Sequence, residues 1–327
     1  TNMLDDMRSE AKTTEAFLDL VNEVGINFIK DFSEANIGNP NVVRLGGGSY
    51  NYNDLYMIQF ANKIINHVKF SPKIICDIGG GYGSLGVKLK RHWKNSTVVF
   101  LDLPEINIVQ IYYITQLYPD AKILTLNGLQ EMYPGTWNEE KISYDFLQQY
   151  DFVILPGWIF EKFEDKIVDL IINTRSMMEM HSSIVNDYIY SIQKKLKVAG
   201  VFYCANRYIK SSVGYPIKLT DYPFDSYWEV LRSSVSWRQP QIHELILERS
   251  NLLSDVSVKE KLVSFLIDST LTINSLDVNR SFIHDMGKSF NIKSKTKYLI
   301  RITFRRIYRN FLNEIPVYLR YIFRKKW

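Results

Sequence analysis

The stretch Cys76–Gly86, which reads CDIGGGYGSLG, decides the fold of this 327-residue chain. It follows an apolar run and leads into an amphipathic segment, so it predicts a sharp glycine turn from a β-strand into an α-helix. Such a turn brings backbone N–H groups and the N-terminus of the helix close to a ligand. The stretch can be read as D-x-G-x-G-x-G from Asp77 or as G-x-G-x-x-G from Gly81. The two registers indicate different nucleoside cofactors.

The carboxylate of Asp77 distinguishes these registers. In the G-x-G-x-x-G fingerprint of dinucleotide-binding proteins the helix N-terminus faces a pyrophosphate, and an acid just upstream would repel it. S-adenosylmethionine has no phosphate but carries an ammonium and a sulfonium group, for which a nearby carboxylate is favourable. Asp102 ends the next apolar run and can accept the ribose hydroxyls of either cofactor. S-adenosylmethionine is therefore the predicted cofactor, and a nicotinamide dinucleotide is the alternative.

Short apolar runs alternate with amphipathic segments from Lys73 onward. Near-continuous apolar strands separated by helices indicate a parallel sheet that helices cover on both faces, so the predicted fold is α/β and Rossmann-like. YWEVLRSSVSW (227–237) and HELILER (243–249) are typical of an antiparallel pair at one edge of this sheet. The apolar runs are KIICDI, TVVFLDL, AKILTL, DFVILP, VDLIINT and GVFYCAN.

The predicted organisation has three parts. Residues 1–70 are expected to be helical, with apolar positions such as Phe17, Leu20 and Val24 at helical spacing and a break rich in Gly and Asn at residues 36–54. Residues 71–250 are expected to form the cofactor-binding domain. Residues 251–327 are expected to be helical again and to end in a basic amphipathic tail.

The net charge of +5 is unevenly distributed along the chain. Residues 291–327 contain eleven Lys or Arg against one acid, Glu314, so this basic tail carries +10 and the preceding chain carries −5. A helix from about Tyr298, interrupted at Pro316, has a wide apolar arc edged by arginines, which is typical of segments lying on an anionic membrane surface. The alternatives are packing on the acidic body of the protein or an oligomer contact. The tail does not resemble a nucleic-acid-binding domain.

The composition of the chain indicates in which cellular compartment the protein is expected. The polar, acidic start and the absence of any run of about 18 uncharged apolar residues argue against a secretion signal and a membrane span. Cys76 and Cys204 lie in apolar runs, which argues against a disulfide framework. A cytoplasmic protein is expected, held on the inner face of the membrane if the basic tail binds lipid.

A series of short motifs resembles the sugar O-methyltransferases associated with bacterial surface-polysaccharide clusters. The series covers roughly residues 50–250, so the last part of the chain lies outside it. The resemblance implies a class I methyltransferase fold and methyl transfer to a sugar hydroxyl. The motifs are DIGGGYG (77–83), LDLPE (101–105), FVILPGW (152–158), DLIINTRSMMEM (169–180) and FYCANR (202–207).

The cofactor is expected beyond the carboxyl ends of the strands, as in other doubly wound sheets. Candidate contacts come from the glycine turn, from the end of the second strand and from the turns that follow later strands. Trp158 could stack on the adenine or could be an ordinary core residue. The candidates are Asp77, Gly79, Gly81, Tyr82, Gly83, Asp102, Leu103, Asn127, Pro156, Trp158 and Asn173.

Catalysis at a sugar hydroxyl requires aligned reactants and one base. His181, with Glu179 to orient it or to bind the sugar, is the first candidate, and His243 is the reserve. The structural alternatives are a helix-capping His181 and a surface His243 on an edge strand. Acceptor contacts are expected from Tyr50, Asn173, Glu179, Asn206 and Arg207, although the two asparagines could instead satisfy backbone groups at strand ends.

No His, Cys, Asp or Glu cluster in the sequence has the spacing of a dedicated zinc site. The function predicted from these residues is S-adenosylmethionine-dependent O-methylation of a surface glycan or its precursor. Two rivals remain open: a nicotinamide-dependent oxidoreductase of the same fold, and a non-catalytic nucleoside-binding subunit of a glycan-assembly complex.

Overall fold

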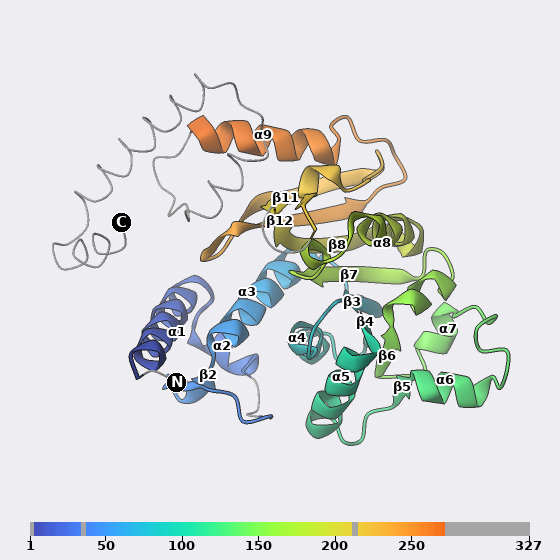
Figure 1. The fold of residues 1–327 in the computed structure, drawn as a ribbon, viewed down its shortest axis with the longest axis horizontal. Helices are drawn as coiled ribbons and strands as arrows, with labels where there is room; N and C mark the ends of the chain where they lie inside the picture. The colour runs from blue at the N-terminus through green and yellow to red at the C-terminus, as the bar shows by residue number, and fades with distance from the viewer. Residues whose placement is uncertain (1–2, 34–36, 211–214, 272–327) are drawn as a thin grey trace.

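The computed structural model describes residues 3–33, 37–210 and 215–271. Within these ranges an eight-stranded sheet forms the centre of the protein, in the order β11-β12-β8-β7-β3-β4-β6-β5 (Figure 1). The strands are β3 (Ile74–Ile78), β4 (Thr97–Asp102), β5 (Ile123–Thr125), β6 (Phe152–Pro156), β7 (Val168–Thr174), β8 (Leu196–Arg207), β11 (Trp228–Ser236) and β12 (Gln239–Arg249). The strands β5, β6, β4, β3, β7 and β8 are parallel, and β12 pairs antiparallel with both of its neighbours, β8 and β11.

Helices cover both faces of the sheet, which is why its central strands are apolar along their whole length. All residues of β3 and β6 are buried. One core contains α3 (Tyr52–His67), α4 (Ser84–His92) and α5 (Pro104–Leu117) against one face. The other contains α6 (Leu126–Met132), α7 (Tyr144–Leu147), α8 (Ser182–Lys195) and the 3-10 helix η1 (Gly157–Lys162). The predicted α/β sheet with helices on both faces is confirmed.

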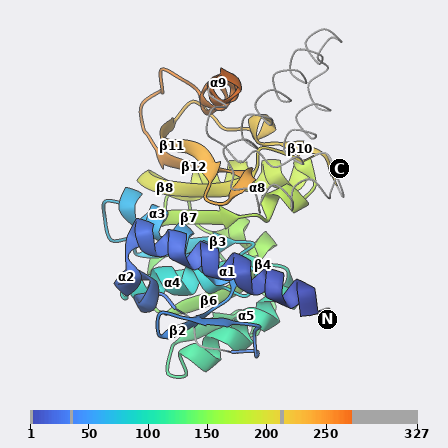
Figure 2. The ribbon, with the colours of Figure 1, turned by 90° about the vertical axis from the view of Figure 1, so that its left-hand side faces the viewer.

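A smaller N-terminal layer packs beside this sheet. It comprises α1 (Met3–Val24), α2 (Ile26–Asp31) and a hairpin of β1 (Val43–Leu45) and β2 (Gly48–Tyr50). Figure 2, viewed from the side of α1, shows this helix in front of α4. The hairpin falls in the predicted break, where Gly46 and Gly47 adopt the positive φ angles of its turn. The predicted break thus contains a short hairpin, which was not itself predicted.

Two buried ion pairs hold α3 in place. Lys88 Nζ of α4 lies 2.6 Å from Asp54 Oδ1, and Lys63 Nζ lies 3.1 Å from Glu244 Oε1 of β12. The hydroxyl of Tyr203 donates to the other oxygen of Glu244. The first pair joins the first turn of α3 to α4, and the second joins the later part of α3 to β12. Removing one partner of either pair would leave an uncompensated buried charge.

The predicted antiparallel pair of β12 and β11 is confirmed, with β11 as the outer strand. Helix α9 (Val258–Leu271) packs against β11, after a loop that replaces the helix expected from about residue 250. The remaining short elements are β9 (Ile209–Lys210), β10 (Ile217–Lys218), η2 (Met177–Glu179) and η3 (Leu219–Asp221). No helix in the described ranges is both long and apolar enough to cross a bilayer. The basic tail lies outside the described residues.

Candidate functional site

The glycine turn joins β3 to α4 at the carboxyl end of the sheet. The amide of Gly79 donates to Leu101 O at 2.8 Å, which fastens the turn to the neighbouring strand β4. A Cβ at Gly79 would lie 2.1 Å from Ser176 Oγ, so this position requires glycine. Gly81 has φ +58° and would place a Cβ in open space. The turn is thus closely packed on one side and open at Gly81, where a ligand can approach its backbone.

Asp77 lies beneath this turn and is fully buried. Among the described residues neither carboxylate oxygen has a hydrogen-bond partner of ordinary geometry. Burial, followed by the negative charge of Asp102, raises the pKa of Asp77 to about 8, and the Gly86 amide opposes this shift without satisfying the carboxylate. A buried carboxylate without a counter-charge is costly, so this side of the turn favours a cationic ligand.

Asp102, at the end of β4, is partly exposed and bound to the same turn. Its Oδ2 accepts from the Gly81 amide at 3.1 Å, and its Oδ1 accepts from the Leu103 amide at 2.9 Å. Gln110 Nε2 donates to Gly81 O at 2.7 Å and lies 3.4 Å from Asp102 Oδ2. Burial raises the pKa of Asp102, while the two amides lower it. Asp102 and Gln110 together fix the peptide of Gly81.

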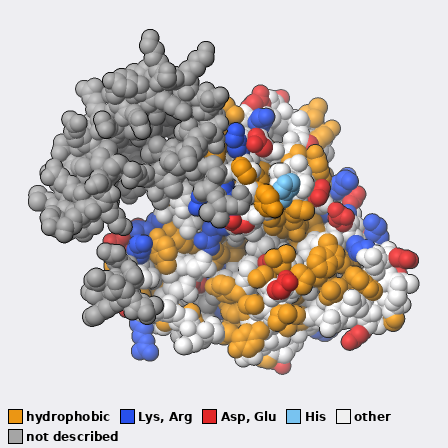
Figure 3. Space-filling model, viewed as in Figure 1, with side chains coloured by type: hydrophobic (Ala, Val, Ile, Leu, Met, Phe, Trp, Pro, Cys, Tyr) orange, Lys and Arg blue, Asp and Glu red, His pale blue; other side chains and the backbone are white. Residues whose placement is uncertain are grey.

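Exposed apolar side chains lie near the strand end that carries Asp102. On the face shown in Figure 3, hydrophobic side chains gather in the lower half of the view, over the region of α5. Leu103 and Trp158, at the ends of β4 and β6, are 64% and 55% exposed. Pro156 is the register partner of Asp102, so these two strand ends are adjacent. Asn127 is exposed on α6.

Tyr82 and Tyr188 complete this part of the site. Tyr82 is half-buried and packs edge-on against Tyr113, with ring centroids 5.0 Å apart. The hydroxyl of Tyr188, on α8, lies 2.1 Å from the position of a Cβ at Gly157. Burial and then the charge of Asp102 raise the pKa of Tyr188 to about 12. Tyr188 therefore reaches from α8 to the end of β6, close to Asp102.

Asn173 and Asn206 are fully buried in a hydrogen-bond network. Asn173 Nδ2 donates to Ile78 O at 2.8 Å, and Asn206 Nδ2 donates to Asn173 Oδ1 at 2.7 Å. Asn206 Oδ1 accepts from the Met178 amide at 3.1 Å. The network joins the ends of β3, β7 and β8 and holds η2 on them. Neither asparagine presents surface to a ligand in this arrangement.

Glu179, the last residue of η2, and His181, which precedes α8, are both exposed. Glu179 Oε2 lies 2.5 Å from Lys210 Nζ, and Lys210 is itself buried. His181 is the N-cap of α8, with Nδ1 2.8 Å from Ser183 Oγ and 3.3 Å from the Ser183 amide. Its ring packs edge-on against Tyr215. Glu179 and His181 therefore have different partners and do not orient each other.

The structure places His243 and Tyr50 away from an exposed site. The interpretation of His243 as a surface residue of an edge strand is wrong, because β11 covers β12 on its outer side and leaves His243 2% exposed. His243 Nε2 lies 2.9 Å from Ser233 Oγ, and burial lowers the pKa of His243 to about 3. Tyr50 is buried in the N-terminal core beside Phe17. Arg207, at the end of β8, is half-buried.

Three residues at the site were not predicted from the sequence: Gln110, Tyr188 and Arg175. Gln110 lies within α5, the helix that follows Asp102, on the side that faces the glycine turn. Arg175 directly follows the predicted strand-end residues Asn173 and Thr174. Its place after a strand is a usable signal, because strand ends in such sheets face ligands. Tyr188 lies in the middle of α8 and could not have been selected.

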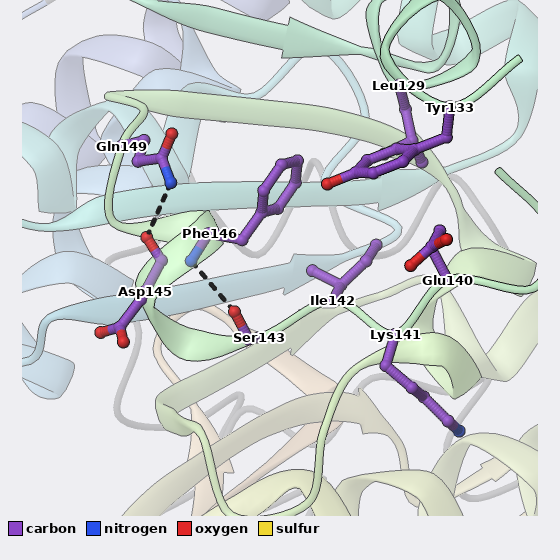
Figure 4. A pocket seen from close by; sticks show the side chains of 9 residues that line it. All are labelled: Leu129, Tyr133, Glu140, Lys141, Ile142, Ser143, Asp145, Phe146 and Gln149. Carbon is purple, nitrogen blue, oxygen red and sulfur yellow. Dashed lines mark hydrogen bonds between the residues drawn. The ribbon is translucent and has the colours of Figure 1, made fainter.

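A hollow of about 280 Å³ lies elsewhere, between α6 and α7 (Figure 4). Two of its polar side chains bond to local backbone groups: Ser143 Oγ accepts from the Phe146 amide, and Gln149 Nε2 donates to Asp145 O. None of the residues predicted for the site lines this hollow. Within the described part of the chain, no three His, Cys, Asp or Glu side chains are grouped to hold a metal ion.

No protein-family model and no curated protein matches the chain. Among solved structures, the mitomycin 7-O-methyltransferase MmcR is similar at 16% identity and TM-score 0.37, over 61% of this chain and 57% of that one. The pyocyanin biosynthetic protein PhzM shows 12% identity and TM-score 0.37, over 60% and 57%. A geranyl diphosphate methyltransferase shows 12% identity and TM-score 0.44, over 61% and 87%. The chain thus spans little more than half the length of the first two.

The fold is that of a class I methyltransferase, a parallel sheet that ends in an antiparallel pair. The strand order defines this fold, and a fold does not by itself define an activity.

Proposed function

We propose that this protein is an S-adenosylmethionine-dependent O-methyltransferase. The observation that carries the proposal is the buried carboxylate of Asp77, which has no hydrogen-bond partner of ordinary geometry among the described residues and lies beneath a turn that is open at Gly81. A cationic amino-acid nucleoside fits this arrangement, because its positive charge offsets Asp77 across the turn. The pyrophosphate of a dinucleotide does not fit, since it would add negative charge there.

The remaining contacts to this cofactor follow from the geometry. Asp102 is partly exposed beside the Gly81 amide and would accept the ribose hydroxyls. Leu103 and Trp158 offer exposed apolar surfaces to the adenine, and Tyr188 would close that side. Gly79, Gly83 and Tyr82 would shape the turn against the amino-acid part, while Asn173 supports it from below. When bound, S-adenosylmethionine supplies a methyl group on a positively charged sulfur, activated for displacement.

The chain's own contribution to catalysis is positioning and removal of one proton. His181 is proposed as the base. In the N-cap arrangement the Ser183 amide donates to Nδ1, which places the proton of the neutral ring on Nε2. Base catalysis therefore requires the other tautomer, in which Nδ1–H donates to Ser183 Oγ and the Nε2 lone pair takes the hydroxyl proton. Glu179 and Arg207 are proposed to bind the acceptor at the same rim. Asn206 acts through Asn173 and is a positioning residue, and the burial of Tyr50 and His243 leaves them no contact in this proposal.

The acceptor proposed here is a sugar hydroxyl of a surface glycan or its precursor. Support comes from the motif series that resembles sugar O-methyltransferases of polysaccharide clusters. Comparing glycans from the parent strain and a strain lacking this protein, by mass spectrometry and NMR, tests the acceptor. Loss of one O-methyl group supports the proposal, and identical glycans would contradict it.

Cofactor binding tests the reaction class. Titration calorimetry with S-adenosylhomocysteine and with NAD should show saturable binding of the first alone. Saturable binding of NAD alone would favour the oxidoreductase rival, which uses the Gly81–Gly86 register. Binding of S-adenosylhomocysteine without methyl transfer to any glycan preparation from the source cells would favour a non-catalytic subunit.

We also propose that the basic tail holds the protein on an anionic membrane surface from the cytoplasmic side. Its eleven basic residues between positions 291 and 327 support this. The full chain should co-sediment with vesicles that contain anionic lipid, and less so as salt rises. Replacing Arg305, Arg306 and Arg309 by Glu should abolish sedimentation, and unchanged sedimentation would contradict a role for the tail.

A further inference from the structure

Arg175 is fixed at the carboxyl end of β7, directly beside the glycine turn. Its chain neighbours Asn173 and Ser176 both donate to Ile78 O, at 2.8 Å and 3.2 Å, so the segment is bonded to the end of β3. The Arg175 amide donates to Ala205 O of β8 at 2.7 Å. The backbone of Arg175 is therefore held between the ends of three strands.

The backbone at Arg175 is strained. Its φ angle of 58° lies in the left-handed region, which residues other than glycine rarely adopt. Such conformations persist only where the surroundings impose them, and they are concentrated at ligand-binding sites. Here the contacts of Asn173, Ser176 and the Arg175 amide impose it. The Arg175 side chain reaches the first turn of α3, where it contacts Asn53.

The guanidinium of Arg175 is half-buried between groups that bind it without neutralising it. Nη2 donates to Asn53 Oδ1 at 2.6 Å, and Cζ lies 6.0 Å from the centre of the Tyr56 ring. Burial lowers the pKa of Arg175, and the nearby hydroxyls of Tyr56, Tyr82 and Tyr203 oppose that shift. Tyr82, a residue of the glycine turn, is among these neighbours, so Arg175 lies near that turn.

Arg175 differs in this respect from two other arginines of the protein. Arg238 pairs with Glu15 and Asp19, and Arg249 pairs with Asp225. No carboxylate of the described residues lies within ion-pair distance of Arg175. A half-buried guanidinium that Asn53 orients, and that makes no other hydrogen bond among the described residues, has the features of an anion-binding group.

We infer that Arg175, oriented by Asn53 and Tyr56, binds an oxyanion, a carboxylate or phosphate, at the carboxyl end of β7. The inference rests on the proposed function. Two ligands of that reaction could bring the oxyanion: the α-carboxylate of the cofactor, or an acidic group on the acceptor such as a uronic acid or a sugar phosphate. In either case the paired N–H donors of the Arg175 guanidinium hold one end of a reactant and align it for methyl transfer.

Two arms of one calorimetric experiment on the full chain separate these sources. The first compares S-adenosylhomocysteine with 5′-methylthioadenosine, which has the same nucleoside but no carboxylate. The second compares glucuronate, glucose 1-phosphate and glucose, each added to protein saturated with S-adenosylhomocysteine. The variants are Arg175→Ala, Arg175→Lys and the control Arg91→Ala, which removes an arginine at the far end of α4 that donates to a backbone carbonyl.

If the oxyanion belongs to the cofactor, Arg175→Ala weakens the binding of S-adenosylhomocysteine by about tenfold or more and leaves the binding of 5′-methylthioadenosine unchanged. If the oxyanion belongs to the acceptor, Arg175→Ala leaves the affinity for S-adenosylhomocysteine unchanged. It then removes the tighter binding of glucuronate or glucose 1-phosphate relative to glucose. In the affected arm the affinity of Arg175→Lys is intermediate, because lysine keeps the positive charge but lacks the paired N–H donors of the guanidinium. This variant serves as the test if Arg175→Ala does not fold.

The inference is overturned if both Arg175 variants bind all five probes as Arg91→Ala does. Failure of the proposed function gives a different result, namely no binding of S-adenosylhomocysteine by the wild-type protein. A wild-type protein that binds S-adenosylhomocysteine, together with Arg175 variants that behave as wild type, therefore rejects the oxyanion site alone.

Discussion

Asp77 and Asp102 lie near the carboxyl ends of the adjacent parallel strands β3 and β4, and their environments differ: Asp77 is fully buried, whereas Asp102 is partly exposed. The charge of Asp102 contributes to the raised pKa of Asp77, after burial itself. The exposed carboxylate can contact a ligand directly, while the buried one acts on it through the turn. This division underlies the first two predictions.

We expect cofactor binding to strengthen with pH. The pKa of Asp77 is about 8 in the folded protein without ligand, so Asp77 is largely protonated near pH 6. The ammonium group of the ligand, which S-adenosylhomocysteine shares with S-adenosylmethionine, favours the ionised form of Asp77. Binding therefore releases a proton, and affinity for S-adenosylhomocysteine rises by up to about tenfold per pH unit between about pH 6 and 8. Calorimetry in buffers of different ionisation enthalpy measures both the affinity and the number of protons released. Asp77→Asn should bind with little dependence on pH, and a flat profile in the wild type would refute the role.

The same carboxylate makes the protein without ligand less stable as pH rises. An unfolded Asp ionises near its ordinary pKa of 3.8, whereas folded Asp77 ionises near 8, so the folded state holds the extra proton between these values. The contribution of Asp77 to the free energy of unfolding is therefore lost as pH rises from about 4 to about 8. Denaturation in urea along this range should show a steeper decline in wild type than in Asp77→Asn.

Asp102→Ala should weaken S-adenosylhomocysteine binding by about tenfold or more, because it removes charge-assisted hydrogen bonds to ribose. It also frees the Gly81 amide, which Gln110 still restrains through Gly81 O. The fold should therefore survive, as judged by an unchanged far-UV spectrum and cooperative unfolding. Glu105→Ala, which removes an acid from the first turn of α5, is the control. Equal affinity in both variants would show that Asp102 does not bind the ribose.

Gly81→Ala should lower cofactor affinity without unfolding the protein. A methyl group at Gly81 meets no atom within 4 Å, but it would occupy the open side of the turn where the ligand is proposed. Gly135→Ala is a matched control, because Gly135 also has a positive φ and an empty surround but lies in a loop after α6. Both substitutions should cost about 1 kcal/mol of stability through backbone strain. Only Gly81→Ala should weaken S-adenosylhomocysteine binding, and equal binding by the two variants would contradict this placement of the ligand.

The sheet was predictable because buried parallel strands leave a strong signal. Apolar runs such as residues 152–156 are long enough to be strands and too short to be helices, and their alternation with amphipathic segments orders them. The hairpin of β1 and β2 was not predictable in this way. Each of its strands has three residues, and its stability depends on long-range packing, including that of Tyr50 against Phe17.

The site was only partly predictable, since a polar residue at a strand end looks the same whether it binds a ligand or the backbone. Asn173 and Asn206 bond to each other and to main-chain groups, a pairing that depends on the register of β7 and β8. The environment of Arg175 depends on Asn53, which lies far away in sequence and reaches the site through the docking of α3. Sequence spacing carries no record of such contacts.

His181 provides the last prediction, because its two roles, catalytic base and N-cap of α8, can be separated by substitution. Asn is among the best N-cap residues and cannot act as a base, whereas Ala does neither. If His181 takes the hydroxyl proton, both His181→Asn and His181→Ala lose roughly 10²–10⁴-fold in turnover while S-adenosylhomocysteine affinity is kept. The measurement is transfer of labelled methyl from S-adenosylmethionine to glycan from the source cells, with His92→Ala, an exposed histidine at the end of α4, as control. If His181 only caps the helix, His181→Asn retains full turnover and His181→Ala loses about 1 kcal/mol of stability; that outcome would remove His181 from the proposed chemistry.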